Sequence, residues 1–550
     1  MVEKYLSRTE FESYEDFIEN YQVNIPDDFN FGYDIVDEWA RIKPEKRALV
    51  WCDDSGNEKE FTFTDISKQS SQIANMLVSA GIKKGDVVLL ILRRRYEYWL
   101  TAVALHKIGA ILIPGSVQLT KKDIAYRAGA ANIKAIITVN DDEVAVQVEE
   151  GLAEFPTVRK YIIGSREGWD DLSKYTEYSD VFERPTGENA IVSTDPLLIY
   201  FTSGTTGMPK MVAHDHTYPL GHITTAKYWQ KVIPDEIHMT VSDSGWAKFG
   251  WGKIYGQWIA GAVVMGYDMD KFVPDTLLRI IEKYRIATFC APPTMYRFFI
   301  KEDLSKYDFS SVKHASIAGE PLNPEVFNQF YEATGLKLME GFGQSESSVM
   351  LANFGWYEPI PGSMGKPSPL YDIDLVDEDG NSVPVGDEGE VVIRNLDKKP
   401  VVGLFKGYFE DGKVITECFK DGVYHTGDVA WRDIAGYYRF VGRTDDVIKC
   451  SGYRIGPFEV ESAVLEHPAV LECAVTAYPD EVRGQVVKAT VVLTKGYSPS
   501  KELIKEIQDH VKKTTAPYKY PRVVDFVDEL PKTLGGKIKR AMIKKQDAGK

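Results

Sequence analysis

Three short apolar runs, separated by amphipathic segments, constrain the fold of this chain more than any other feature of its sequence. The runs are rich in isoleucine, leucine and valine, as expected of strands that are buried on both faces of a sheet. The segments around them carry apolar side chains at helical spacing. Strands are expected at residues 87–92, 110–113 and 135–139, and helices at residues 64–80, 97–108 and 121–131. This βαβαβ order predicts an α/β fold with a parallel sheet flanked by helices.

The last hundred residues have a different pattern. Short strands are expected at residues 473–477 and 486–493, and helices at residues 458–466 and 501–513. Strands and helices of this length predict a small α+β unit with a core of its own. Fifty residues at this end, 501–550, carry thirteen basic side chains against seven acidic ones.

Composition excludes several classes of protein. The hydrophobic share of 44% and the charged share of 27% are those of a globular protein. The formal net charge of −16 argues against a nucleic-acid partner, because neutralising phosphates needs a basic surface. The five cysteines form no CxxC pair, which favours a reducing compartment over a disulfide framework. We find no secretory signal and no apolar run of about 20 residues, and so we predict a soluble, cytoplasmic protein with no integral membrane segment.

A loop rich in glycine and hydroxyl groups, residues 202–210, follows a predicted strand. Glycines let backbone N–H groups approach an anion, and hydroxyl groups and a lysine add donors and positive charge. The residues expected to bind phosphate are Thr202, Ser203, Gly204, Thr205, Thr206, Gly207 and Lys210. Two residues separate the glycines and Met211 follows the lysine, so the spacing disfavours a P-loop kinase or ATPase.

Residues 202–210 resemble the signature loop of the adenylate-forming superfamily, which includes acyl-CoA synthetases, luciferases and peptide-synthetase adenylation domains. Five further segments resemble the other motifs of that superfamily in the same order, over residues 60–540. By this resemblance the chain is identified as an AMP-forming acyl-CoA synthetase, most similar to the medium-chain enzymes. The resemblance implies ATP, Mg²⁺ and coenzyme A as cofactors and substrates, with no zinc or redox cofactor.

The resemblance also assigns nucleotide contacts. Residues 318–322 resemble the segment that holds adenine, and residues 341–346 resemble the aromatic-Gly-x-Thr-Glu motif, with Phe for Tyr and Ser for Thr. Asp428 corresponds to the carboxylate that accepts hydrogen bonds from the ribose, and Glu346 to the catalytic ligand of Mg²⁺, a cation that prefers oxygen donors. The remaining nucleotide residues implied in these segments are Gly319, Glu320, Pro321, Gly341, Phe342, Gly343, Gln344 and Ser345.

Motifs near the C-terminus resemble those that, in this superfamily, rearrange the active site between two reactions. The first joins the acid to AMP, and the second transfers the acyl group to a thiol. The implied roles are ribose contact for Arg443, hinge for Asp445, passage of the pantetheine arm for Gly452, phosphate contact for Arg454 and catalysis of adenylation for Lys537. The resemblance thus implies a large N-terminal domain, residues 1–444, which holds the acyl and ATP sites. The rest of the chain, residues 445–550, would be a small mobile lid domain.

The acid and the thiol acceptor are less constrained. Acetate-activating relatives have Trp at the position of Gly343, which closes the acyl pocket, so glycine favours a longer acid. Trp246 lies in a segment that resembles the aromatic segment beside the acyl site of medium-chain enzymes. We therefore expect a medium-chain or branched fatty acid. Lys512, Lys513 and Lys519 are candidates to meet the phosphates of coenzyme A.

Several alternatives stay open from the sequence. An aryl-CoA ligase or a stand-alone acid-adenylating enzyme fits the same motifs, and a non-catalytic scaffold is disfavoured because Glu346, Asp428 and Lys537 are all present. The spacing of His214, His216 and His222 fits no usual zinc pattern. The oligomeric state is open between a monomer and a homodimer.

Overall fold

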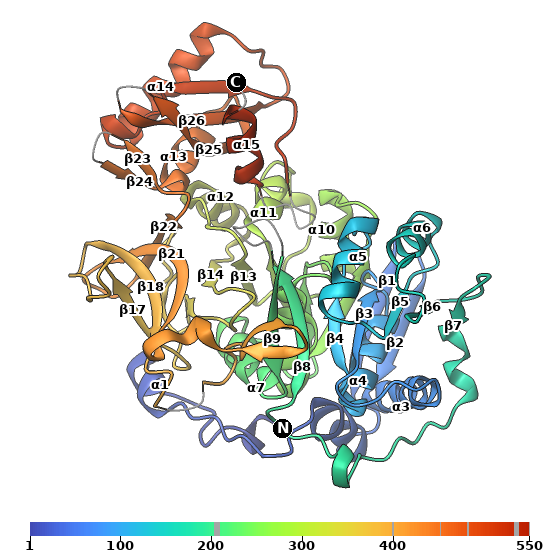
Figure 1. The fold of residues 1–550 in the computed structure, drawn as a ribbon. Coiled ribbons are helices and arrows are strands. Elements are labelled where there is room, and N and C mark those ends of the chain that lie inside the picture. The colour runs from blue at the N-terminus through green and yellow to red at the C-terminus, as the bar shows by residue number, and fades with distance from the viewer. Residues whose placement is uncertain (203–208, 399–400, 451–452, 481–482, 533–537, 549–550) are drawn as a thin grey trace.

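The computed structural model describes residues 1–202, 209–398, 401–450, 453–480, 483–532 and 538–548. Figure 1 shows a large N-terminal body below a small C-terminal domain, coloured orange to red. Within the described ranges, the strands form four sheets. Three of these sheets belong to the N-terminal body and one to the C-terminal domain, as expected for an α/β domain followed by an α+β domain.

The first nine-stranded sheet contains the predicted βαβαβ segment. Its order is β20-β19-β9-β8-β4-β3-β5-β6-β7, and β4, β3, β5 and β6 run parallel to one another. The strands are β3 (Val87–Ile91), β4 (Ile111–Pro114), β5 (Ala135–Thr138), β6 (Arg159–Ile162), β7 (Asp170–Asp171), β8 (Pro196–Thr202), β9 (Lys210–Asp215), β19 (Gly407–Glu410) and β20 (Lys413–Ile415). The antiparallel strands β9, β19 and β20 extend this sheet at one edge.

The second nine-stranded sheet is parallel in its centre, from β14 through β13, β12, β10 and β11 to β1. Its strands are β1 (Arg47–Asp53), β2 (Glu58–Thr62), β10 (Ile237–Thr240), β11 (Val263–Asp268), β12 (Thr288–Ala291), β13 (His314–Ala318), β14 (Leu338–Phe342), β15 (Leu351–Ala352) and β16 (Lys366–Pro367). Each parallel connection places loops at the carboxyl ends of the strands, where open α/β sheets bind ligands.

Two smaller sheets complete the chain. An antiparallel sheet of β17 (Asp372–Val376), β18 (Glu388–Arg394), β21 (Tyr424–Arg432) and β22 (Tyr438–Arg443) ends the N-terminal body. The C-terminal sheet contains β23 (Ile448–Cys450), β24 (Tyr453–Ile455), β25 (Val470–Asp480), β26 (Gly484–Leu493) and β27 (Val523–Phe526). The chain therefore passes from the antiparallel sheet of the N-terminal body to the C-terminal sheet between Arg443 and Ile448.

Helices cover both large sheets and the C-terminal sheet. In the N-terminal body they are α1 (Tyr14–Asn20), α2 (Glu38–Ile42), α3 (Phe63–Ser79), α4 (Glu97–Ile108), α5 (Lys121–Ala130), α6 (Asp142–Gly151), α7 (Tyr218–Ile223), α8 (Ala247–Lys253), α9 (Tyr255–Ile259), α10 (Pro274–Lys283), α11 (Pro293–Phe299) and α12 (Pro324–Thr334). The C-terminal domain adds α13 (Pro457–Leu465), α14 (Lys501–Thr514) and α15 (Arg540–Ala548). No helix in the described part of the chain has the length and apolar character needed to span a bilayer.

The helix α4 shows how the two large sheets share one core. All of its residues are buried, which is typical of a helix surrounded by protein on every side. Trp99 of α4 donates a hydrogen bond to the carbonyl of Lys253 at the end of α8, at 2.5 Å. Its ring also lies against Gly266 in β11, where an added Cβ would come within 2.9 Å of the indole. We conclude that α4 packs between the sheet of β3 and the sheet of β11.

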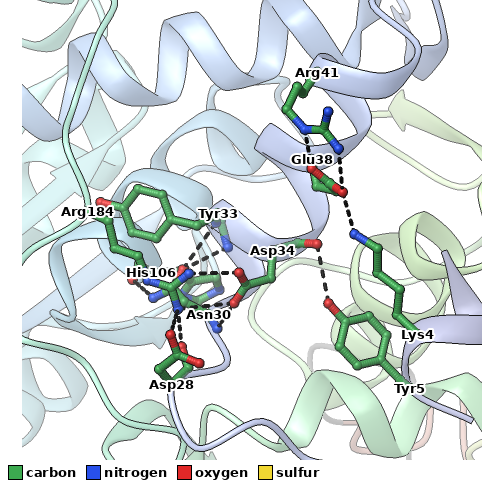
Figure 2. Close-up of polar contacts among 11 residues, drawn as sticks. Lys4, Tyr5, Asp28, Asn30, Tyr33, Asp34, Glu38, Arg41, His106 and Arg184 are labelled. Atoms are coloured by element: carbon green, nitrogen blue, oxygen red, sulfur yellow. Dashed lines mark hydrogen bonds and ion pairs between the residues drawn. The ribbon is translucent and has the colours of Figure 1, made fainter.

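The acidic N-terminal segment is fixed to the body by polar contacts (Figure 2). Arg184, from the long connection before β8, forms an ion pair with Asp34 at 2.8 Å. The amide of Asn30 donates to the carbonyl of His106 at the end of α4, at 2.6 Å. Glu38 accepts from Arg41 at 2.7 Å and also pairs with Lys4. The contacts of Asp34 and Asn30 hold this segment against parts of the chain that follow much later, whereas those of Glu38 lie within the segment itself.

Candidate active site

The site lies where loops leave the ends of strands in different sheets. β8 ends at Thr202, β13 at Ala318 and β14 at Phe342, and each strand leads directly into one of the predicted motifs. The third sheet contributes Asp428 from β21. Because β13 and β14 are parallel neighbours, the adenine motif and the 341–346 motif start side by side. The fold thus explains why motifs far apart in the sequence converge.

The loop predicted to bind phosphate connects two paired antiparallel strands, β8 and β9. Thr202 at the end of β8 pairs with Lys210 at the start of β9. The Lys210 side chain is exposed, and its Nζ lies 4.7 Å from the ring centroid of Tyr408. Five residues predicted to bind phosphate lie outside the described residues: Ser203, Gly204, Thr205, Thr206 and Gly207. For this motif, the structure therefore describes the paired strands on either side and the position of Lys210.

Polar contacts link the 341–346 segment to Asp428. The amide of Gln344 donates to the carboxylate of Asp428 and, at 2.8 Å, to the carbonyl of Thr426. Arg443 also approaches both residues, with Nη1 2.9 Å from the Thr426 carbonyl and 3.3 Å from Asp428 Oδ1. Tyr424 donates its hydroxyl to Gln344 Oε1 at 2.9 Å. Asp428 is only 5% exposed, so this network holds a carboxylate in a fixed orientation at the edge of the site.

Glu346 supplies a second carboxylate. It accepts a hydrogen bond from the Tyr408 hydroxyl at 3.3 Å, and burial raises the pKa of its carboxyl group. A buried carboxylate favours a cation beside it, because a positive charge offsets the cost of removing the anion from water. Its oxygen donors are of the kind that Mg²⁺ prefers. The residue present therefore fits the divalent cation that the sequence motif implies.

The segment predicted to hold adenine is shaped by its backbone. Gly319 has φ +106°, which a residue with a side chain rarely adopts. Lys248 donates to the carbonyl of Ala318 at 2.7 Å, and burial lowers the pKa of this lysine. Glu320 accepts from Thr294 at 3.0 Å and approaches Arg297 at 3.4 Å. Pro321 follows, and the ring centroid of Phe342 lies 6.3 Å from that of Phe440.

The segment that carries Lys537 lies outside the described residues, but its two flanks are described. Lys532 and Ile538 form an isolated β-bridge, and Lys532 pairs with Glu472 at 2.6 Å. Both flanks line a small cavity together with Glu320 of the N-terminal body. The flanks of this segment therefore face the adenine segment.

The other predicted residues of the C-terminal domain are partly described. Asp445 is exposed, and its carbonyl accepts a hydrogen bond from Lys544 at 3.0 Å. Gly452 lies outside the described residues. Arg454 belongs to β24, and its side chain also lies outside the described part of the structure.

The lysines expected to meet coenzyme A differ in their surroundings. Lys519 forms an ion pair with Glu459 at 2.5 Å, and Lys512 approaches Asp509 at 3.2 Å. Lys513, in the last turn of α14, is exposed. Two of the three positive charges are therefore already paired with carboxylates of the same domain.

The predicted acyl pocket has a different wall from the one expected. The indole of Trp251 lies directly against Gly343, where an added Cβ would come within 2.3 Å of the ring. The space that glycine was expected to leave open is thus occupied by a tryptophan from α8. Trp246 precedes α8 as its N-cap residue. In the described part of the chain, the indole N–H groups of both tryptophans are buried without a hydrogen-bond partner.

One of the three histidines singled out from the sequence contacts the 341–346 segment. His214 Nε2 lies 2.7 Å from the carbonyl of Ser345, and burial lowers the pKa of His214 to about 3. The imidazole is therefore neutral at physiological pH and helps to fix the 341–346 segment. His216 and His222 are buried as well.

Three residues important for the geometry were not predicted from the sequence. Tyr408 joins Glu346 to Lys210, Thr426 accepts from both Gln344 and Arg443, and Trp251 lies against Gly343. Trp251 belongs to the aromatic segment that also holds Trp246, so a weak signal was present. Thr426 lies two residues before Asp428, in the same short motif, so a signal was present for it as well. Tyr408 gave no signal from spacing, because its partners lie in other segments.

Comparison with known proteins identifies the family. The model of the AMP-binding enzyme matches residues 36–409, and that of the AMP-binding enzyme C-terminal domain matches residues 459–537. The chain is 41% identical to the mouse (Mus musculus) acyl-coenzyme A synthetase ACSM3, mitochondrial, over 98% of this chain and 94% of that protein.

Two solved structures are also similar. The crystal structure of an acyl-CoA synthetase from Brucella canis has a TM-score of 0.74 and 31% identity, over 98% of this chain and 99% of that one. The anthranilate CoA ligase AuaEII, solved in complex with anthranoyl-AMP, has a TM-score of 0.86 and 27% identity, over 95% and 98% of the two chains. On its sequence, its fold and the geometry of its site, the chain belongs to the AMP-binding enzyme family, among the acyl-CoA synthetases.

Proposed function

We propose that this enzyme activates a medium-chain or branched fatty acid in two steps at one site. In the first step the acid carboxylate attacks the α-phosphate of ATP, which gives an acyl-adenylate and pyrophosphate. In the second step the thiol of coenzyme A attacks the acyl carbon, which gives acyl-CoA and releases AMP. The observation that carries this proposal is the convergence of Asp428, Glu346 and Lys210 around the Gln344 segment.

The first step brings two anions together, so positive charge and positioning are its main requirements. No general base is needed, because a fatty acid is ionised at neutral pH. Lys210 and the loop before it would bind the departing phosphates, and Lys537 would bridge the acid and the α-phosphate. Mg²⁺ held by Glu346 would neutralise phosphate charge as that charge builds up. Partial burial of Glu346, which raises the pKa of its carboxyl group, supports this role, since a bound cation would offset the cost of removing the anion from water.

The nucleoside would be held by the network around Asp428. A carboxylate fixed by Gln344 and Arg443 can accept hydrogen bonds from two ribose hydroxyls. The half-buried ring of Phe342 would stack on adenine, beside the backbone of residues 319–321. These contacts would bind ATP in the first step and the AMP half of the acyl-adenylate in the second.

The second step would require the small domain, residues 445–550, to turn about Asp445. The small cavity formed by Lys532, Ile538 and Glu320 supports an orientation suited to adenylation. A rotation would exchange the Lys537 segment for the Gly452 loop and open a path for the pantetheine arm. Arg454 would contact phosphate, and Lys512, Lys513 and Lys519 would meet the phosphates of coenzyme A. The relative named above is mitochondrial, so the cytoplasmic location expected from the sequence stays a prediction.

The acid would enter beside Trp251 of α8, whose indole lies against Gly343. Trp251, together with Trp246 directly before α8, would give that region an aromatic wall, and apolar surface of this kind favours an alkyl chain over acetate. An aryl-CoA ligase is the second candidate, because the anthranilate CoA ligase has the same fold with a TM-score of 0.86.

The test is a screen of pyrophosphate and AMP release over C2 to C12 straight-chain, branched and aromatic acids, with and without coenzyme A. We expect AMP rather than ADP, a maximum at medium-chain or branched acids, and turnover that requires coenzyme A. A maximum at benzoate or anthranilate would support the aryl-CoA ligase, and full turnover without a thiol would support a stand-alone adenylating enzyme. In a Lys537→Ala variant, we expect loss of adenylation but continued thioester formation from supplied acyl-adenylate.

A further inference from the structure

The strand β19 is joined by its backbone to both charged segments of the site. Tyr408 of β19 pairs with Val212 of β9, the strand whose first residue is Lys210. Three residues before Tyr408, the amide of Phe405 donates to the carbonyl of Glu346 at 2.7 Å. The stretch around β19 is therefore fixed to the hairpin of the phosphate loop on one side and to the Glu346 segment on the other.

The glycine before Tyr408 allows β19 to pair closely with β20. Gly407 has φ +141°, and an added Cβ would come within 2.2 Å of the carbonyl oxygen of Ile415 in β20. A side chain at position 407 would therefore separate β19 from β20. With glycine there, β19 keeps its pairing, and the Tyr408 side chain reaches the site.

The side chain of Tyr408 contacts both charged groups, each with a different part. Its hydroxyl donates to Glu346 Oε1 at 3.3 Å, and Lys210 Nζ lies 4.7 Å from its ring centroid. A phenol hydroxyl is a donor suited to a carboxylate, whereas the face of an aromatic ring attracts an ammonium group. One residue thus binds the anion and the cation at separate places.

This separation matters because Lys210 and Glu346 carry opposite charges. Opposite charges attract each other, and a direct ion pair between these two side chains would turn both of them away from a ligand. We propose that Tyr408 is a positioning residue for adenylation. Its hydroxyl orients the Glu346 carboxylate toward the cation that accompanies ATP, and its ring holds the Lys210 ammonium beside the phosphates. This inference rests on the roles proposed above for Glu346 and Lys210.

The experiment measures the binding of ATP alone by titration calorimetry, without acid or coenzyme A, first in EDTA and then with Mg²⁺. Tyr408→Phe removes only the hydroxyl group, so its ATP affinity in EDTA should equal that of the wild type. The gain in affinity on adding Mg²⁺ should shrink about tenfold, the size expected when a hydrogen bond to a charged group is lost. Tyr408→Leu also removes the ring, and so its affinity in EDTA should fall about two- to fivefold as well.

Tyr331→Phe is the matched control, because it makes the same chemical change at an exposed tyrosine of α12, and we expect it to bind like the wild type. An unchanged Mg²⁺ gain in Tyr408→Phe would overturn the role of the hydroxyl, even if the leucine variant were unfolded. Equal affinities of Tyr408→Phe and a folded Tyr408→Leu in EDTA would overturn the role of the ring. Failure of the proposed function would be distinguishable, since the wild type itself would then release no pyrophosphate from ATP with any acid.

Discussion

Arg540 forms an ion pair with Glu461 in which Nη2 lies 2.7 Å from both carboxylate oxygens. Glu461 also accepts the amide of Val475 at 2.7 Å and is almost fully buried. Arg540 begins α15, three residues after Lys537. The pair therefore fixes the helix that follows the lysine segment to α13 and to the sheet of the C-terminal domain.

Replacing Glu461 with Gln should destabilise the C-terminal domain. The largely buried guanidinium would lose the carboxylate that it pairs with, and breaking a buried pair in this way costs about 3 kcal/mol. The measurement is the free energy of unfolding in urea. Glu358→Gln breaks an exposed pair with Lys337, and it should change stability by less than about 1 kcal/mol. An equal loss of unfolding free energy in the two variants would show that the Arg540–Glu461 pair stabilises the protein no more than an exposed pair does.

Replacing Asp428 with Asn should weaken ATP binding. The variant keeps the shape of the side chain but loses the charge that Arg443 and Gln344 orient. We expect the KM for ATP to rise about tenfold or more, the effect of losing charge-assisted hydrogen bonds, while the KM for the acid changes little. Asp379→Asn, at an exposed turn, serves as the control. An unchanged KM for ATP would place the ribose elsewhere.

The three candidate lysines for coenzyme A should not contribute equally. Lys513 is exposed, whereas Lys519 is paired with Glu459 and Lys512 approaches Asp509. Lys513→Gln should therefore raise the KM for coenzyme A most, by about two- to fivefold for one screened phosphate contact. Adenylation, measured as pyrophosphate release without coenzyme A, should not change in any of the three variants. A loss of adenylation in Lys513→Gln would contradict a role confined to coenzyme A.

Local sequence patterns predicted the fold well, because each such signal lies within one element. The helix expected at residues 97–108 is α4 to the residue, ended by Gly109 in the left-handed conformation. The helix expected at residues 64–80 is α3, which begins one residue earlier, at Phe63. Thr62 caps it and forms a capping box with Asp65, which satisfies two backbone donors.

The site was predictable only where its residues lie in contiguous motifs. Asp428 and Gln344 each belong to such a motif, and they meet in the structure. Tyr408 and Trp251 reach their partners across different sheets and helices. No spacing within one chain encodes those contacts, because they depend on how β19 and α8 pack against β14 and the loop that follows it.

Trp251 should control the length of acid that the enzyme accepts. Its indole lies against Gly343 and is 5% exposed. Trp251→Ala would leave a cavity beside the proposed acyl site, so kcat/KM should shift toward longer acids, by about fourfold for each added methylene that becomes buried. Trp258→Phe, in the core of α9, controls for a general loss of packing. An unchanged chain-length profile in Trp251→Ala would place the acyl pocket away from Gly343.

Glu340 should make the stability of the protein fall as the pH rises. Burial raises the pKa of its carboxyl group from 4.5 to about 8. Between these two values the native protein holds a proton that the unfolded chain releases, so raising the pH favours unfolding across this window. Glu340→Gln removes the titrating group, and its free energy of unfolding relative to the wild type should increase from pH 5 to pH 8 by up to a few kcal/mol. Urea unfolding at pH 5, 6.5 and 8 measures this difference, with Glu332→Gln on the exposed face of α12 as the matched control. A difference between Glu340→Gln and the wild type that stays constant with pH would show that this carboxyl group is ionised in the folded protein throughout the range.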